Sequence, residues 1–203
     1  MKRRVTPRGE FGKSTATGRR TRTLPHRPVG KGGKARGEDA PPPPAKSLLL
    51  NNRQRTRKIN QRLLREVSLG LLDDHLQLKA YKLGITLIAE TEMTRLNSTF
   101  LQHRGSTDVI TFDYADVPDL STNICGEIFA CVDEAVLQAR RFCTTWQSEI
   151  VRYIIHGTLH LLGHDDHVAS YRRKMKREEN RLLRLLATRF PLSRLAPKPR
   201  LRR

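Results

Sequence analysis

The stretch that says most about the fold and chemistry of this chain is His156-Gly157-Thr158-Leu159-His160-Leu161-Leu162-Gly163-His164-Asp165-Asp166-His167. The apolar sequence before it predicts a helix that begins near Trp146 or Gln147 and ends at Leu162, with Gly163 as its C-terminal stop. His156 and His160 lie one helical turn apart, so both imidazoles share one face and can bind one metal ion. The stretch therefore predicts a metal site, with zinc as the expected ion.

The residues after Gly163 supply the remaining candidates for this site. The chain turns back there and brings His164, Asp165, Asp166 and His167 past the two histidines. Three protein ligands and a water molecule would form an open site of the catalytic type. The alternative is that the histidines only pack, but four of the seven histidines of the chain fall within these 12 residues, together with two aspartates.

The zinc-protease pattern H-E-x-x-H-x-x-G-x-x-H offers a comparison with two differences. Gly157 stands where a protease has its glutamate general base, which argues against peptide hydrolysis. The offset of the third ligand falls on Asp166, with His167 one residue beyond it. Asp166 fits the spacing and His167 is the commoner ligand type, so the third ligand is Asp166 or His167, with a preference for Asp166.

The rest of the chain predicts a single α+β domain with a small mixed sheet packed by helices. Strands are expected within 48–50, 83–89, 107–114 and 126–131, and helices over 57–72, 92–101, 133–142 and 168–186. Asp133 or a neighbour is the expected N-cap of the third of these helices.

Positive charge gathers at the two ends of the sequence. The net charge is +19, and residues 1–46 hold 13 Lys and Arg against 3 acidic residues, while residues 172–203 hold 13 against 2. The segment 1–46, rich in Gly and Pro, is expected to be a disordered basic arm, 47–187 the folded domain and 188–203 a basic tail. Such ends suit a polyanion such as RNA, or they serve as solubilising charge.

The expected compartment is the cytoplasm. The three cysteines are odd in number and follow no known metal-ligand spacing, and no apolar signal segment opens the chain. No apolar run approaches the roughly 20 residues that span a bilayer. An organelle transit peptide is the rival interpretation of the N-terminal segment.

The histidine stretch resembles the YbeY family of metal-dependent endoribonucleases and rRNA maturation factors. Other segments resemble that family's signatures in the same order: Leu96-Asn97, Ser106-Thr107-Asp108-Val109-Ile110-Thr111-Phe112, Gly126-Glu127-Ile128, Asp133-Glu134-Ala135 and Gln138-Ala139. The resemblance implies one zinc-like ion on three side chains, single-stranded RNA as substrate, and a role with the small ribosomal subunit in rRNA 3′-end maturation and ribosome quality control.

Two positions depart from the family pattern. Leu101 stands where many members have an arginine, and His103 or Arg104 is the candidate to supply that charge to the substrate. Asp166 stands where many members have the third histidine ligand. A carboxylate there lowers the net charge of the site and makes the ion a weaker Lewis acid.

Phosphodiester hydrolysis by a metal-bound water is the leading hypothesis for function. His164 or Asp165 is the candidate to move the proton, although Asp165 is more typical of a carboxylate that orients a ligand histidine. A ribosome-assembly binding factor with a structural metal is the alternative, and a closed site that uses both Asp166 and His167 would favour it. A metalloprotease is disfavoured by Gly157.

Overall fold

The computed structural model describes the chain except for residues 1–3, 6–45, 103–104, 115–123 and 198–203. Most of the expected N-terminal arm, the end of the C-terminal tail, and both His103 and Arg104 therefore lie outside the described residues. Within the described part, no helix has the length and apolarity that crossing a bilayer requires.

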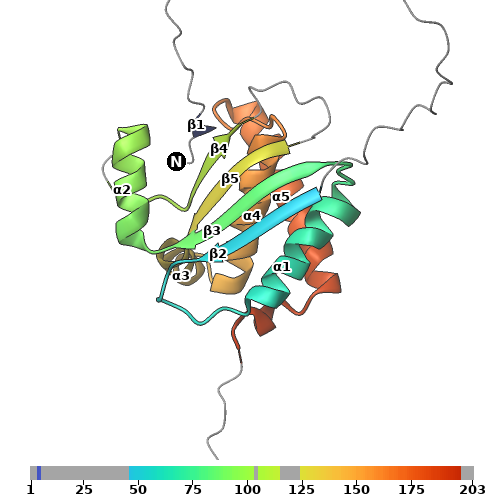
Figure 1. Cartoon of the computed structure of the whole chain (residues 1–203), viewed down its shortest axis with the longest axis horizontal. Coiled ribbons are helices and arrows are strands. Elements are labelled where there is room, and N and C mark those ends of the chain that lie inside the picture. The colour runs from blue at the N-terminus through green and yellow to red at the C-terminus, as the bar shows by residue number, and fades with distance from the viewer. Residues whose placement is uncertain (1–3, 6–45, 103–104, 115–123, 198–203) are drawn as a thin grey trace, which may run out of the picture. The chain divides into compact units, whose positions relative to one another are not determined.

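A mixed sheet forms one layer of the domain (Figure 1). Its strand order is β1-β4-β5-β3-β2, with β1 at Arg4–Val5, β2 at Lys46–Asn52, β3 at Tyr81–Ile88, β4 at Val109–Asp113 and β5 at Ile124–Cys131. β3 pairs in parallel with β2 and β5, β1 pairs in parallel with β4, and β4 is antiparallel to β5. The strands expected from residue type are confirmed, with small differences at their ends.

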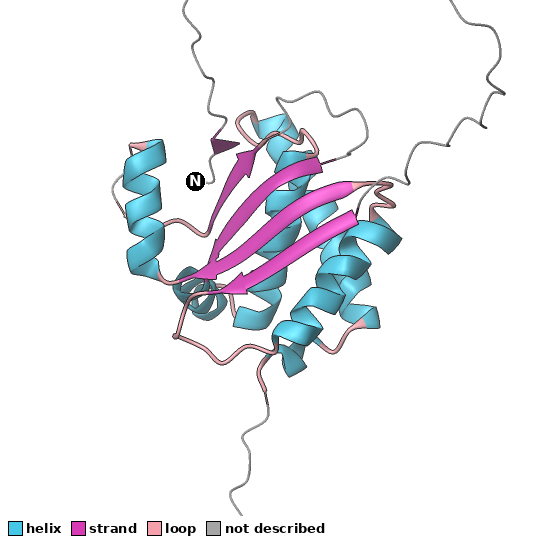
Figure 2. Cartoon of the chain, in the orientation of Figure 1, coloured by secondary structure: helices cyan, strands magenta, loops and turns pink. Residues whose placement is uncertain are grey.

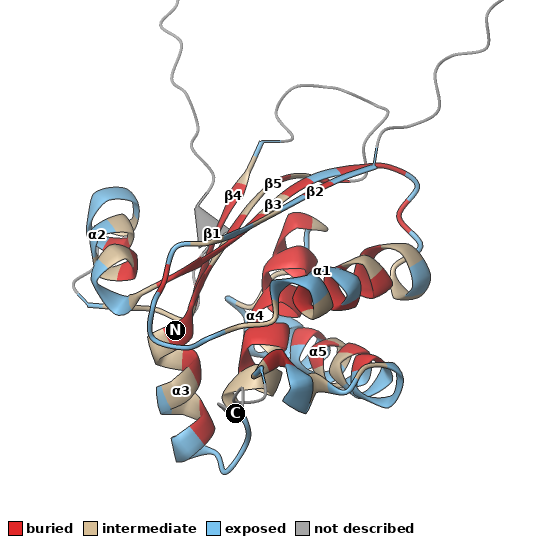
Figure 3. Cartoon of the chain, turned by 60° about the horizontal axis from the view of Figure 1, so that its bottom comes forward, coloured by how far each residue is buried: buried red, intermediate tan, exposed pale blue. Residues whose placement is uncertain are grey.

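Helices cover the sheet mainly on one face, where α1, α4 and α5 lie together (Figures 2 and 3). The helical elements are α1 (Gln61–Leu69) with a π-helical continuation η1 (Gly70–His75), α2 (Glu90–Leu101), α3 (Val132–Arg141), α4 (Trp146–Leu161), α5 (Ala169–Arg189) and a 3-10 turn η2 (Leu192–Leu195). The mixed sheet with its helices confirms the expected α+β class.

The main core lies between the sheet and α4. Every residue of α4 from Glu149 to Leu161 is buried except Arg152, as expected for a helix that is apolar on nearly all sides. A smaller apolar cluster lies under α2, where Met93 packs with Ile110 and Phe112 of β4. The central position of α4 fixes the side chains of its last turns within the core.

Two expected helix starts are corrected by the structure. The first helix begins at Gln61 instead of residue 57, because the Asn60 side chain accepts a hydrogen bond from the backbone N–H of Leu63 at 3.1 Å and caps it there. Asp133 lies inside α3 and caps a different helix, since its Oδ2 accepts from the N–H of Glu90 at 2.8 Å. The cap of α2 thus comes from a residue 43 positions away in sequence.

The C-terminal segment is folded further than its composition indicates. α5 continues to Arg189, and Leu195 of η2 is buried, with its carbonyl accepting a hydrogen bond from the N–H of Asn60 at 2.9 Å. Much of the positive charge of residues 172–203 therefore lies on a helix.

Candidate metal centre

The last turns of α4 present His156 and His160 on the same side of the helix. Their ring centroids are 4.5 Å apart and the rings are nearly perpendicular, at 88°. Both residues are buried, at 2% and 3% exposure. The predicted juxtaposition of the two imidazoles is present in the structure.

Gly163 ends α4 and reverses the chain, as its place in the sequence predicts. Its φ of 87° is in the left-handed region that glycine adopts without strain. The N–H of Gly163 donates to the carbonyl of His160 and the N–H of His164 to that of Leu159, both at 2.9 Å, the hydrogen-bond pair of a Schellman motif. This turn directs the following loop back toward the histidines.

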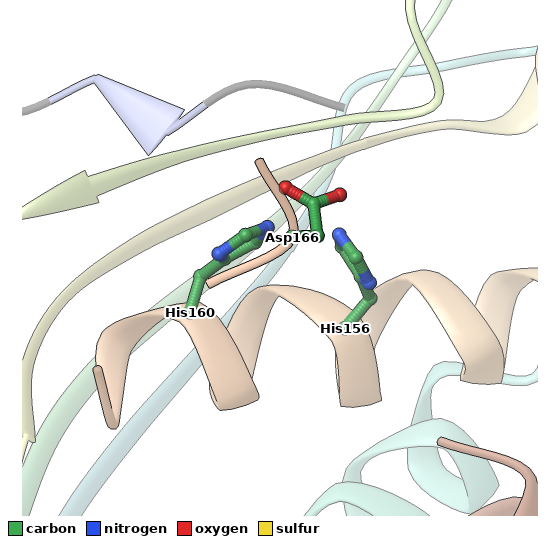
Figure 4. Close-up of side chains that lie close together, drawn as sticks. All are labelled: His156, His160 and Asp166. Atoms are coloured by element: carbon green, nitrogen blue, oxygen red, sulfur yellow. The ribbon is translucent and has the colours of Figure 1, made fainter. Parts of the chain in front are cut away.

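The loop brings the Asp166 carboxylate to the two histidines (Figure 4). Ligand atoms of His156, His160 and Asp166 lie within 4.8 Å of one another. Arg172 of α5 holds this loop through two hydrogen bonds. Its Nε donates to the carbonyl of Asp166 at 3.0 Å and its Nη2 to the carbonyl of His167 at 3.4 Å. Between the two candidates for a third ligand, the structure brings Asp166 to the histidines.

His167 lies apart from the histidine pair. Its side chain is 62% exposed and its Nε2 is 3.7 Å from Oδ1 of Asp165, so it groups with Asp165 and Asp166 only. Asp165 in turn accepts a hydrogen bond from the N–H of His167 at 2.9 Å, and this bond lowers the pKa of its carboxyl. Asp165 is therefore ionised near neutral pH, which suits a proton acceptor or an orienting group better than an acid.

His164 contributes to the site through its backbone. Its carbonyl accepts a hydrogen bond from Nδ1 of His160 at 3.0 Å, so Nε2 is the atom of that ring that could bind a metal ion. His164 and Asp165 line a pocket of about 300 Å³ together with Leu162, Gly163, Tyr171 and Lys174.

Glu179 of α5 is the residue that pattern reading missed. Its Oε1 is 2.5 Å from Nδ1 of His156, and both side chains are 2% exposed. The sequence carries a signal for it, because a glutamate at 179 interrupts a buried helical stripe formed by Met175, Leu182 and Leu186. An acidic residue on an otherwise apolar helix face indicates a buried partner that donates a hydrogen bond or carries a positive charge.

The absence of a side chain at residue 157 has a steric reason as well as a chemical consequence. A Cβ atom at this position would lie 2.9 Å from Cγ2 of Ile128 and 3.0 Å from Cγ2 of Thr111, because α4 packs closely against β5 and β4. A side chain at residue 157 would therefore require Ile128 and Thr111 to shift, which argues against a protease-type glutamate at this position.

Comparisons with known proteins identify the family of this chain. The family model described as Endoribonuclease YbeY matches residues 49–187. The chain belongs to the YbeY endoribonuclease family. The match confirms the resemblance carried by the histidine stretch and by the upstream segments.

Individual YbeY relatives are similar over different lengths. The chain is 40% identical over 92 residues to an Endoribonuclease YbeY of Chlorobium luteolum, covering 45% of this chain and 64% of that protein. It is 29% identical over 140 residues to that of Finegoldia magna, covering 68% and 92%. A solution structure of a Thermotoga maritima protein superposes with a TM-score of 0.54 at 22% identity, covering 77% of this chain and all of the other, which supports the fold alone.

Proposed function

We propose that this chain is a metal-dependent endoribonuclease that hydrolyses RNA phosphodiesters at the site formed by His156, His160 and Asp166. The observation that carries the proposal is the approach of these three side chains within 4.8 Å, at the end of a buried helix. The Nε2 atom of His156 is buried and has no hydrogen-bond partner in the described part of the chain. A buried nitrogen in that state is costly unless a ligand binds it.

The donor set fits a zinc-like ion. Two imidazole nitrogens and one carboxylate oxygen match the three-ligand composition of catalytic zinc sites, which keep one position open. When bound, such an ion would polarise a phosphate oxygen and lower the pKa of a bound water. The residues of the chain would hold the substrate and accept the proton, with the Asp165 carboxylate and the His164 imidazole as the two candidates.

The proposed substrate is single-stranded RNA, with rRNA of the small ribosomal subunit and its 3′-end maturation in the cytoplasm as the inferred setting. Family membership supports the nuclease chemistry. The charge of α5 supports a nucleic-acid partner, since Arg173, Arg177 and Arg184 are exposed along one side of the helix that follows the metal loop. His103 and Arg104 stay candidates for substrate contact.

A structural metal in a ribosome-assembly factor is the competing function. It would be favoured by a closed site with four protein ligands. Among the described residues His167 is exposed and groups with Asp165 and Asp166, an arrangement that supports an open site and favours the nuclease.

A cleavage assay tests the proposal. The metal-loaded chain is incubated with a 5′-labelled single-stranded RNA, beside the His160→Ala variant and a chelated sample. We expect cleavage by the loaded chain alone. Cleavage of equal rate in both controls would refute a metal-dependent nuclease, and metal binding without cleavage on single-stranded or ribosomal RNA would favour the assembly factor.

A further inference from the structure

The Glu179 carboxylate is buried beside His156, next to the Nδ1 atom of its ring. It projects from α5 toward α4 and is 2% exposed, a position that an ionised carboxylate occupies only with strong partners. One oxygen, Oε1, lies 2.5 Å from Nδ1 of His156. The other, Oε2, lies 3.4 Å from Nη1 of Arg152 and 3.6 Å from Nζ of Lys176.

Arg152 fixes the direction of this carboxylate. The guanidinium is also bonded through Nη1 to Oδ1 of Asn180 at 2.7 Å, and its Nε lies 3.6 Å from Oε2 of Glu149. Glu149 is itself buried and accepts a hydrogen bond from Oγ1 of Thr144 at 2.8 Å. These contacts hold Arg152 against Oε2 of Glu179. The other carboxylate oxygen, Oε1, therefore faces Nδ1 of His156.

We propose that Glu179 is a positioning residue that sets the tautomer, orientation and donor strength of His156 for the metal. A carboxylate is an acceptor only, so the imidazole donates Nδ1–H to it and keeps the lone pair of Nε2 for the ion. The negative charge raises the electron density of the ring and makes Nε2 a stronger ligand. This inference rests on the proposed metal site and adds to it a residue outside the histidine stretch.

The two histidines are held by different kinds of acceptor. His160 donates Nδ1–H to a neutral backbone carbonyl, that of His164, whereas His156 faces a charged side chain. A charged acceptor gives a hydrogen bond roughly twice as strong as a neutral one. His156 is therefore the better fixed of the two ligands, and its contribution to metal affinity depends on a residue that substitution can remove.

The matched control is the adjacent Glu178. It lies on the same helix, carries the same charge and pairs with exposed Arg181 at 2.6 Å, and its contacts do not include His156. Substitution of Glu178 changes the net charge as much as substitution of Glu179. A difference between the two variants then reports the buried contacts of Glu179, with His156, Arg152 and Lys176, and not the net charge.

Metal affinity is measured by competition with a chromophoric chelator, using Zn²⁺ alone and no RNA. We expect Glu179→Gln, which keeps an acceptor but loses the charge, to weaken binding about 10-fold, and Glu179→Ala about 100-fold, the range known for such supporting residues. Glu178→Gln should stay within about 2-fold of the unmodified chain. Thermal unfolding of each metal-free variant separates lost affinity from lost folding, and Glu179→Gln carries the test if Glu179→Ala does not fold.

A spectrum of the unmodified, metal-free chain gives a second readout. In protein labelled with ¹⁵N-histidine, His156 should show the Nδ1–H tautomer, and Nε2–H there would overturn the proposal. Glu179 variants that bind Zn²⁺ as tightly as the Glu178 control would also overturn it, leaving a merely structural ion pair with Arg152. If His160→Ala binds Zn²⁺ normally as well, the metal site itself is refuted, so the two failures are distinguishable.

Discussion

The two halves of the candidate metal centre are built differently. His156 and His160 belong to α4, a helix that is almost wholly buried, and their places are fixed by packing against the sheet. Asp166 belongs to a loop that is partly exposed and is held by the turn at Gly163 and by the two hydrogen bonds from Arg172. One half is rigid through the core, and the other is placed by a few polar contacts.

This contrast suits one of the two departures from the family pattern, the aspartate at position 166. Two positions one turn apart on a buried helix have a fixed separation, so only side chains of the right length can reach a shared metal ion. Both histidines of the motif are present at these positions. A loop can present either a carboxylate or an imidazole with a small adjustment of the backbone. Substitution of a ligand is therefore expected to be more tolerated in the loop than in the helix.

The largest effect is expected from His160→Ala, which removes a candidate ligand from the buried helix α4. Removal of a direct ligand should weaken Zn²⁺ binding by more than about 100-fold, since residues behind the ligands already account for about 10- to 100-fold. Chelator competition measures the loss, and thermal unfolding of the metal-free variant is the control for folding. Binding within about 3-fold of the unmodified chain would show that α4 does not supply the ligands.

Substitution of the loop ligand should have a smaller effect. Asp166→Ala is expected to weaken Zn²⁺ binding by about 30-fold, and Asp166→His to restore most of the affinity, because an imidazole there is a common zinc ligand. His167→Ala is the matched control and should bind within about 2-fold of the unmodified chain. The reverse pattern, a loss at His167 with no loss at Asp166, would assign the third ligand to His167.

Gly157→Ala tests the packing that makes the helical half rigid. The new methyl group would crowd Ile128 and Thr111 at about the cost of an overpacked core, ~1–3 kcal/mol, partly offset by the helix preference of alanine of about 1 kcal/mol. We expect a net destabilisation of about 1 kcal/mol, within a range of about 0–2 kcal/mol, in urea unfolding. Ser170→Ala, on the exposed start of α5, is the control. A Gly157→Ala variant at least as stable as the unmodified chain would contradict the close contact.

Arg172→Gln should give the smallest change. It removes two hydrogen bonds to loop carbonyls at an exposed side chain, so the loop holding Asp166 gains freedom at little cost in overall stability. We expect Zn²⁺ affinity to fall about 3-fold, measured as above. Arg173→Gln removes an equal charge from the next residue, and an equal fall in both variants would attribute the effect to net charge.

Much of the site could be predicted because its signals are local. The spacing of His156 and His160, the stop at Gly163 and the offset of Asp166 all lie within 12 residues, and helix geometry converts that spacing into distance. The α+β class followed in the same way from strand and helix patterns. Helix starts were less predictable, because Asn60 is a cap of only one hydrogen bond and Asp133 serves a helix 43 residues away.

The amino-acid sequence alone was enough to place two histidines on one helix face and to limit the third ligand to Asp166 or His167. The tertiary structure brought the Asp166 carboxylate, and not the His167 imidazole, close to the two histidines, brought Glu179 from α5 against His156, and placed side chains of the sheet beside Gly157. The reason is physical: residues within one helical turn are related by fixed geometry, whereas contacts between α4, α5 and the loop depend on how the whole core packs.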